Sequence, residues 1–324
     1  MISVISTVLN EGESIRRLLD SLAAQTRQPD EIVIADGGSA DNTVAILREY
    51  EAKLPLHVLV EPGANISAGR NRAIAAAEGE IIAVTDAGVR LASDWLERLT
   101  QPLLDDPSLE VVSGFFEADA RTPFETALGA TTLPLADEID PQTFLPSSRS
   151  VAFRKSAWIT VGGYPEWLDY CEDLIFDLRL RETAAPTMFE PRARVYFRPR
   201  PTLEAFIKQY YRYARGDGKA DLWRRRHAIR YATYLIAAPL IFWLGWRKHP
   251  LLWSLFLPGA FVYLREPYRR LLTLLSADVT SDDRLYMLAL VPVIRVVGDL
   301  AKMLGYPVGW WWRLKHRPPD WRKV

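Results

Sequence analysis

The chain has 324 residues, of which 49% are hydrophobic and 25% charged, so it can bury a sizeable core and is neither disordered nor low in complexity. Forty Lys and Arg balance forty Asp and Glu, which argues against a general nucleic-acid binder, because such proteins need a basic excess. The single cysteine, Cys171, cannot form an internal disulfide, and with only four histidines a structural zinc site is not expected. We therefore expect the folded chain in a reducing compartment.

Hydrophobic periodicity predicts alternating strands and helices in the first part of the chain. Strands are expected at residues 2–8, 31–35, 56–60 and 81–85, with helices at about 13–24, after residue 41, and at 68–77. Such alternation with short turns predicts a parallel, doubly wound sheet, which binds ligands beyond the carboxyl ends of its strands. Asn10, Glu11, Asp36 and Asp86 follow strand ends, so we expect them to share one cleft, although each alone is typical of a cap or turn.

Three common catalytic loops are missing from the sequence. There is no Gly-x-Gly-x-x-Gly after the first strand and no Gly-Lys-Ser/Thr phosphate loop, which argues against a dinucleotide oxidoreductase and a P-loop NTPase. The sequence also lacks a Gly-x-Ser-x-Gly elbow, which argues against an α/β-hydrolase.

Seven short motifs instead follow one another within about residues 1–220. They occupy residues 6–11, 35–41, 68–74, 85–88, 153–164, 172–174 and 209–213. In this order they resemble the motifs of family 2 glycosyltransferases. The resemblance implies an α/β domain of the GT-A fold, a Rossmann-like nucleotide-diphospho-sugar transferase.

The resemblance also implies a role for particular side chains. Asp173 would be the general base, which must reach the acceptor hydroxyl, and its neighbour Glu172 would orient the acceptor. Acidic residues in this pair are also typical of the first turn of a helix. A UDP- or GDP-linked sugar would be bound by Thr7, Asn10, Glu11, Asp36, Arg70, Asp86, Gln209 and Arg212.

Asp86 is also the implied ligand of Mg²⁺ or Mn²⁺, which would face the donor diphosphate. Gly37 and Gly88 stand where the family often has the second aspartate of two motifs. The two missing carboxylates concern whether the enzyme depends on a metal and which nucleotide base it binds. Arg212 would donate to the diphosphate, or would belong to an exposed basic helix face.

The last third of the chain differs in composition, and we place a boundary near Leu222, giving regions 1–222 and 223–324. Eight of the eleven tryptophans lie from Trp223 onward. Two uncharged apolar runs, 231–246 and 251–264, are flanked by arginines, and a third segment, 285–304, is expected to be amphipathic or packed. The short runs predict a membrane-associated helical hairpin. The alternatives are a soluble helical subdomain and a dimer interface.

Together these features predict a membrane-associated, inverting glycosyltransferase. It would transfer a sugar to a hydroxyl of a lipid-linked or polysaccharide acceptor at the cytoplasmic face of the cell membrane. One alternative is a nucleotide-sugar-binding protein that has lost catalysis, as Gly37 and Gly88 suggest. Another is a nucleotidyltransferase, whose Gly-rich, Lys-containing phosphate loop is missing here.

Overall fold

The computed structural model describes residues 1–275 and 279–322. The chain forms two compact units that do not follow the sequence in two blocks. Unit 1 comprises Met1–Asp119, Ala136–Phe197 and the segment from Pro319 onward, and unit 2 comprises Ala120–Leu135 and Arg198–Pro318. Each unit is described by itself below.

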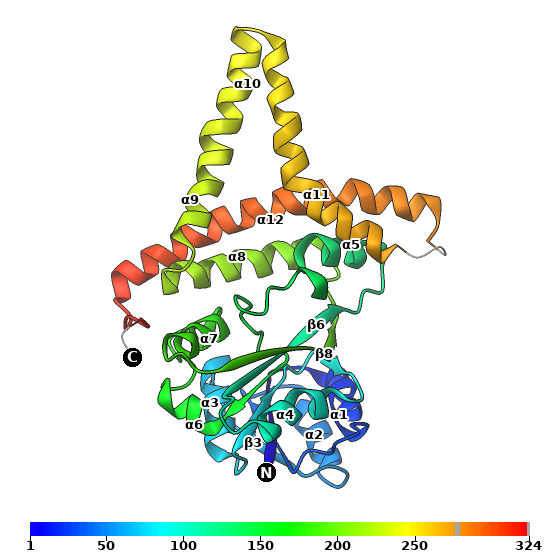
Figure 1. Cartoon of the computed structure of the whole chain (residues 1–324), viewed down its shortest axis with the longest axis vertical. Helices are drawn as coiled ribbons and strands as arrows, with labels where there is room; N and C mark the ends of the chain where they lie inside the picture. The colour runs from blue at the N-terminus through cyan, green and yellow to red at the C-terminus, as the bar shows by residue number, and fades with distance from the viewer. Residues whose placement is uncertain (276–278, 323–324) are drawn as a thin grey trace. The chain divides into compact units, whose positions relative to one another are not determined.

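Unit 1 contains an eight-stranded mixed sheet (Figure 1), in the order β3-β2-β1-β4-β7-β6-β8-β5. The strands are β1 (Ile2–Val8), β2 (Glu31–Asp36), β3 (Leu56–Val60), β4 (Ile81–Val84), β5 (Val89–Leu91), β6 (Val111–Ala118), β7 (Val151–Arg154) and β8 (Thr187–Phe197). The helices are α1 (Ile15–Ala23), α2 (Thr43–Tyr50), α3 (Ile66–Ala76), α4 (Trp95–Asp105), α6 (Lys155–Thr160) and α7 (Glu172–Glu182).

The predicted parallel sheet is correct for the first four strands, and the full sheet is mixed. β1 pairs in parallel with β2 and β4, and β2 pairs in parallel with β3. β7 then pairs antiparallel with both β4 and β6. The sequence-based expectation stopped at residue 85, so it did not include β5 to β8. Antiparallel pairing of β7 brings the residues before β7 to the carboxyl end of β4, where a ligand is expected.

Two apolar clusters cover the two faces of this sheet. One contains α1, α2 and α4 side chains such as Leu18, Leu47 and Trp95, packed on alternate strand residues. The other contains Ile74 of α3 and Phe176 of α7. The continuous burial of β1 and β2 follows from this two-sided cover, which parallel strands require.

Unit 2 is built from helices. They are α5 (Pro123–Thr132), α8 (Leu203–Ala220), α9 (Arg224–Ala232), α10 (Ala238–Arg247), α11 (Phe256–Leu274) and α12 (Ser281–His316), with a π-helical turn at Thr233–Ala237. α12 packs along α8 and against α5, and the buried residues of α12 recur every three or four positions. The expectation of a packed segment at 285–304 is therefore confirmed.

The α8–α12 contact depends on three glycines. A Cβ atom at Gly305 or Gly309 of α12 would lie 2.1 Å from the carbonyl oxygen of Tyr211 or 2.0 Å from that of Arg215. A Cβ atom at Gly218 of α8 would lie 2.3 Å from the carbonyl oxygen of Tyr306. The two backbones approach so closely that no side chain fits between them.

This packing bears on the sequence-based boundary. α8 precedes Leu222, and its packing partner α12 follows it, so a chain ending at Leu222 would lose the helix that covers α8. The division into regions 1–222 and 223–324 remains a prediction. The compact units place α5 and α8 with the C-terminal helices.

We expect Gly305→Ala and Gly309→Ala, made together, to destabilise the protein by about 1–3 kcal/mol, because added carbon atoms force the two helices apart. Thermal unfolding monitored by circular dichroism measures the effect. Gly259→Ala in α11 is the matched control, since nothing lies within 4 Å of its Cβ position, and alanine there should be neutral or stabilising by up to about 1 kcal/mol. Equal melting temperatures for the double variant and the control would contradict the packing argument.

Candidate active site

The centre of the site is the buried guanidinium group of Arg70, on α3. Its Nη1 donates to Glu172 Oε1 at 2.6 Å, and its Nη2 donates to Asp86 Oδ1 at 2.8 Å. The guanidinium carbon also lies 5.3 Å from the centre of the Tyr164 ring. Burial opposes the charge of Arg70, but Glu172 and Asp86 raise its pKa above the ordinary value. One cation thus joins three of the sequence motifs.

Local sequence explains how α3 carries Arg70 into the interior. Asn65 begins the helix, and its side chain accepts a hydrogen bond from the Ala68 N–H. Gly69 then allows close approach to the sheet, because a Cβ atom there would lie 2.9 Å from Cγ2 of Thr7. Thr7, a predicted donor-binding residue, therefore packs against α3 from β1.

Glu172 and Asp173 open α7, directly after Cys171. Cys171 is buried and has a left-handed backbone with φ of 66°, an unusual conformation for a residue other than glycine. Burial and the Asp173 carboxylate raise the pKa of Glu172, while Arg70 opposes this shift. Asp173 itself is only partly buried, and its Oδ1 accepts a hydrogen bond from the Leu174 N–H at 2.9 Å. Asp173 is thus accessible to a substrate, whereas Glu172 beside it is buried.

A third carboxyl group, Asp177, lies one helical turn beyond Asp173. Its side chain is buried, and Oδ2 has no hydrogen-bond partner within the described residues. Burial raises the pKa of Asp177 well above its usual value, and the Asp173 charge adds to the shift. Asp177 was not among the residues predicted from the sequence. Its spacing of four from Asp173 on a helix was the available signal.

The loops after β1 and β2 are joined by side-chain hydrogen bonds. Oδ1 of Asp36 accepts from the N–H groups of Gly38 and Ser39, and Oδ2 accepts from the Ser39 hydroxyl. The Asn10 side chain accepts from Ala40 N, and the Asn10 N–H donates to Ser39 Oγ. The buried Asp36 carboxylate therefore shapes this loop.

Glu11, which follows Asn10, donates its backbone N–H to Thr43 Oγ1 at 3.0 Å. Its side chain accepts a hydrogen bond from Ser14. The predicted donor-binding residues Asn10, Glu11 and Asp36 are thus brought together at the carboxyl ends of β1 and β2. Asn10 and Glu11 keep exposed surface, whereas Asp36 is buried.

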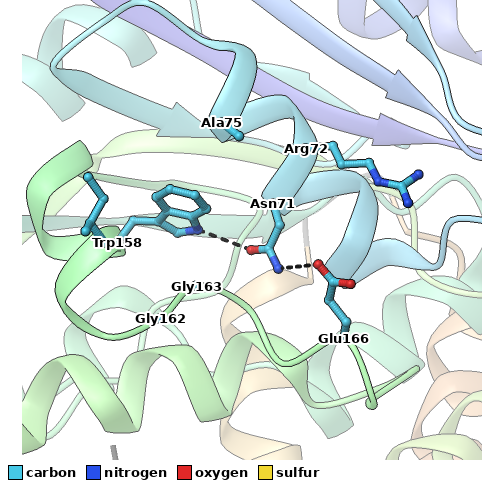
Figure 2. A pocket seen from close by; sticks show the side chains of 8 residues that line it. Asn71, Arg72, Ala75, Trp158, Gly162, Gly163 and Glu166 are labelled. Atoms are coloured by element: carbon cyan, nitrogen blue, oxygen red, sulfur yellow. Dashed lines mark hydrogen bonds between the residues drawn. The ribbon is translucent and has the colours of Figure 1, made fainter.

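Asn71, next to Arg70, connects α3 to the loop before α7. Its side chain accepts a hydrogen bond from Tyr164 N and donates one to Tyr164 O, both at 2.8 Å. Figure 2 shows the same amide between Trp158 and Glu166, to which it is also hydrogen-bonded. Asn71, Trp158 and Glu166 line an open pocket of about 500 Å³, and none of the predicted catalytic or donor-binding residues lines it. The hydrogen bonds of Asn71 fix the loop that carries Tyr164.

The residues around Asp86 bear directly on the predicted metal site. Oδ1 is bonded to Arg70, and Oδ2 lies 3.6 Å from Nε of Arg149. Gly88 supplies no ligand atom from a side chain, and residues 1–275 and 279–322 contain no group of three or more His, Cys, Asp or Glu that could hold a metal. A divalent cation at Asp86 would lie beside two guanidinium groups. The residues present therefore do not fit the predicted Mg²⁺ or Mn²⁺ site.

The two remaining predicted residues, Gln209 and Arg212, lie on α8 in unit 2. Gln209 Nε2 donates to the Tyr213 hydroxyl at 2.9 Å. Their part in donor binding stays a prediction. Arg149, in contrast, lies in unit 1 beside Asp86 and was not among the predicted residues.

A sheet of this kind, with acidic residues beyond the carboxyl end of β4 and at the start of α7, defines a nucleotide-sugar-dependent glycosyltransferase of the GT-A fold. Residues 3–158 match the family model described as Glycosyl transferase family 2. These residues form a domain of that family, and the chain is a glycosyltransferase.

Comparisons with individual proteins agree with this class. The chain is 28% identical over 254 residues to the succinoglycan biosynthesis protein ExoA of Rhizobium meliloti (strain 1021), covering 74% of this chain and 76% of ExoA. It is 25% identical to the glycosyltransferase AglE of Haloferax volcanii, covering 68% of this chain and 74% of AglE.

Solved structures show the same fold. The mannosyltransferase PcManGT from Pyrobaculum calidifontis, in complex with GDP-Man and Mn²⁺, superposes with a TM-score of 0.56 at 18% identity, covering 98% of this chain and 87% of that one. S. aureus TarS, residues 1–349, gives a TM-score of 0.51 at 20% identity, covering 97% and 92%. At this level of identity the likeness extends to the fold alone.

The raised pKa of Asp177 predicts a pH-dependent effect of Asp177→Asn on stability. The pKa of Asp177 is about 3.9 in the unfolded chain and higher in the folded protein. At pH values between these two, the folded protein keeps the Asp177 carboxyl protonated while the unfolded chain has lost that proton. The free energy of unfolding of the wild type therefore falls as pH rises through this window. Asparagine has no carboxyl group to ionise, so the variant does not lose stability in this way as pH rises. We expect the variant to be more stable than wild type at about pH 8, by about 1 kcal/mol or more, and the difference to shrink toward about pH 4.

Thermal unfolding as a function of pH measures this difference. Glu80→Gln is the control, because Glu80 is an exposed carboxylate in the same unit. A stability difference that does not change with pH would show that Asp177 is not held protonated by the fold.

Proposed function

We propose that the protein is an inverting glycosyltransferase that moves a sugar from a UDP- or GDP-linked donor to a hydroxyl of a glycan or lipid-linked acceptor. The observation that carries this proposal is the buried network in which Arg70 joins Asp86 and Glu172, with the partly exposed Asp173 beside them. The name of the relative ExoA, which refers to succinoglycan biosynthesis, favours a polysaccharide as the product.

The assignment of roles follows from the ion pairing and the exposure of these groups. The acceptor hydroxyl oxygen attacks the anomeric carbon, and Asp173 takes the hydroxyl proton. The bond from the anomeric carbon to the diphosphate oxygen breaks, and the nucleoside diphosphate leaves. Glu172, paired with Arg70, cannot approach the acceptor without breaking a buried ion pair. We therefore assign the proton to Asp173 and a positioning role to Glu172.

Asp173→Asn should lower turnover by about 10²-fold or more and leave donor affinity nearly unchanged, because the amide keeps the size of the side chain but cannot accept the proton. A thermal-shift screen of UDP- and GDP-sugars first identifies the donor, since a ligand of the native state raises the melting temperature. Transfer of the labelled sugar then measures turnover.

Glu182→Gln, at the exposed end of the same helix, is the matched control and should retain activity. Near-normal turnover in Asp173→Asn would contradict the assignment of the base. Donor binding without transfer in the wild type would favour the alternative of a nucleotide-sugar-binding protein. Release of pyrophosphate from a nucleoside triphosphate would favour a nucleotidyltransferase.

We also propose that unit 2 holds the enzyme at the cytoplasmic face of the cell membrane. Within unit 2, α9 and α10 run into α11 as a long hairpin (Figure 1). Arg224–Arg247 is the single described helix long and apolar enough to cross a membrane, and only 6% of its apolar window is buried. Exposed apolar side chains continue past the turn, where Trp253 packs against Gly245. A contiguous apolar surface of this kind is typical of lipid contact.

A double variant, Phe242→Ser with Trp246→Ser, should therefore lose most binding to phospholipid vesicles in a flotation assay. Both side chains are more than half exposed in the hairpin. Ile159→Ser, an equally exposed apolar residue of α6 in unit 1, is the control and should bind as wild type. Wild-type protein that does not float with vesicles and forms a dimer would instead support the dimer-interface alternative.

A further inference from the structure

Strand pairing fixes the position of Arg149 opposite Asp86. β4 and β7 are antiparallel, with Val84 opposite Val151 and Ile81 opposite Arg154. Continued by two residues beyond the ends of the strands, this register sets position 86 opposite position 149. The observed separation of 3.6 Å between Arg149 Nε and Asp86 Oδ2 agrees with that geometry.

Aromatic rings hold the Arg149 guanidinium in place. Its central carbon lies 4.8 Å from the centre of the Phe197 ring and 5.8 Å from that of Phe116. Nη1 also donates to Ser147 Oγ at 3.0 Å. Stacking on aromatic faces restricts an arginine side chain without removing its charge. The side chain keeps 24% of its surface exposed, so a ligand can reach it.

Both oxygens of Asp86 already face cationic groups. Arg70, which also pairs with Glu172, faces one oxygen, and Arg149 faces the other. A divalent cation would be repelled by both guanidinium groups. Packing does not force the loss of a second carboxylate, because the Cβ position of Gly88 opens into free space. A diphosphate, in contrast, matches the planar donors of arginine.

We propose that Arg149 is a ligand of the donor diphosphate, and that guanidinium groups at Asp86 balance the diphosphate charge in place of a divalent cation. This inference rests on the proposed function, since it concerns the donor of that same reaction. It adds a phosphate-binding residue that lies outside the sequence motifs, and it accounts for the pairing of both oxygens of Asp86.

Isothermal titration with UDP and GDP, in excess EDTA and again with Mn²⁺, tests the proposal on the full chain. Wild type should bind one of the two nucleotides with the same affinity in both conditions. Arg149→Ala should weaken that binding about tenfold or more in both, because a charged hydrogen-bond donor is lost. Arg149→Lys should give an intermediate affinity, since it keeps the charge but not the planar donors.

Arg98→Ala is the matched control, since Arg98 also pairs with an aspartate, Asp94, but on the surface of α4. It should bind as wild type. Wild-type binding that is lost in EDTA and restored by Mn²⁺ would overturn the inference while supporting the proposed function. Wild-type affinity in the folded Arg149 variants would also overturn it. Failure of wild type to bind either nucleotide in both conditions would overturn the inference and the proposed function together.

Discussion

The ion pairs of Arg70 are the constraint on which the rest of unit 1 depends. A buried guanidinium is tolerated only when its charge is paired, and here two carboxylates from different parts of the chain supply the pairing. Loss of Arg70 would leave the buried Glu172 carboxylate without this partner, which costs roughly several kcal/mol. The two ion pairs join the carboxyl end of β4, α3 and the start of α7, beside the apolar cluster that contains Ile74 and Phe176.

This arrangement separates the acidic groups at the start of α7 into different roles. Glu172 is held by Arg70, Asp177 is buried and has a raised pKa, and Asp173 alone keeps access to solvent. Carboxylates close together do not all ionise readily. Because the pKa of Asp177 is raised, this group favours its neutral form and adds little negative charge beside Asp173.

The sequence was sufficient to predict the first four strands, the helices between them and the family, because these depend on local periodicity and on contiguous motifs. It could not predict the antiparallel β7, since a pairing between strands far apart in the chain leaves no local pattern. Arg149 was missed for the same reason. The metal ligand was inferred at Asp86 from resemblance, and only the structure revealed that both of its oxygens face arginines. The boundary at Leu222 followed composition, which does not record that α8 packs on α12.

The antiparallel register between β4 and β7 has a consequence for how this enzyme can diversify. Arg149 is positioned by pairing that begins at Val151 and by its hydrogen bond to Ser147, at the end of the segment before it. That segment, from the end of α5 at Thr132 to Ser148, contains little regular structure. Insertions, deletions and substitutions in the part before Ser147 would leave the strand pairing and the Ser147 hydrogen bond of Arg149 in place. The loop can therefore vary in length and composition while Arg149 stays opposite Asp86.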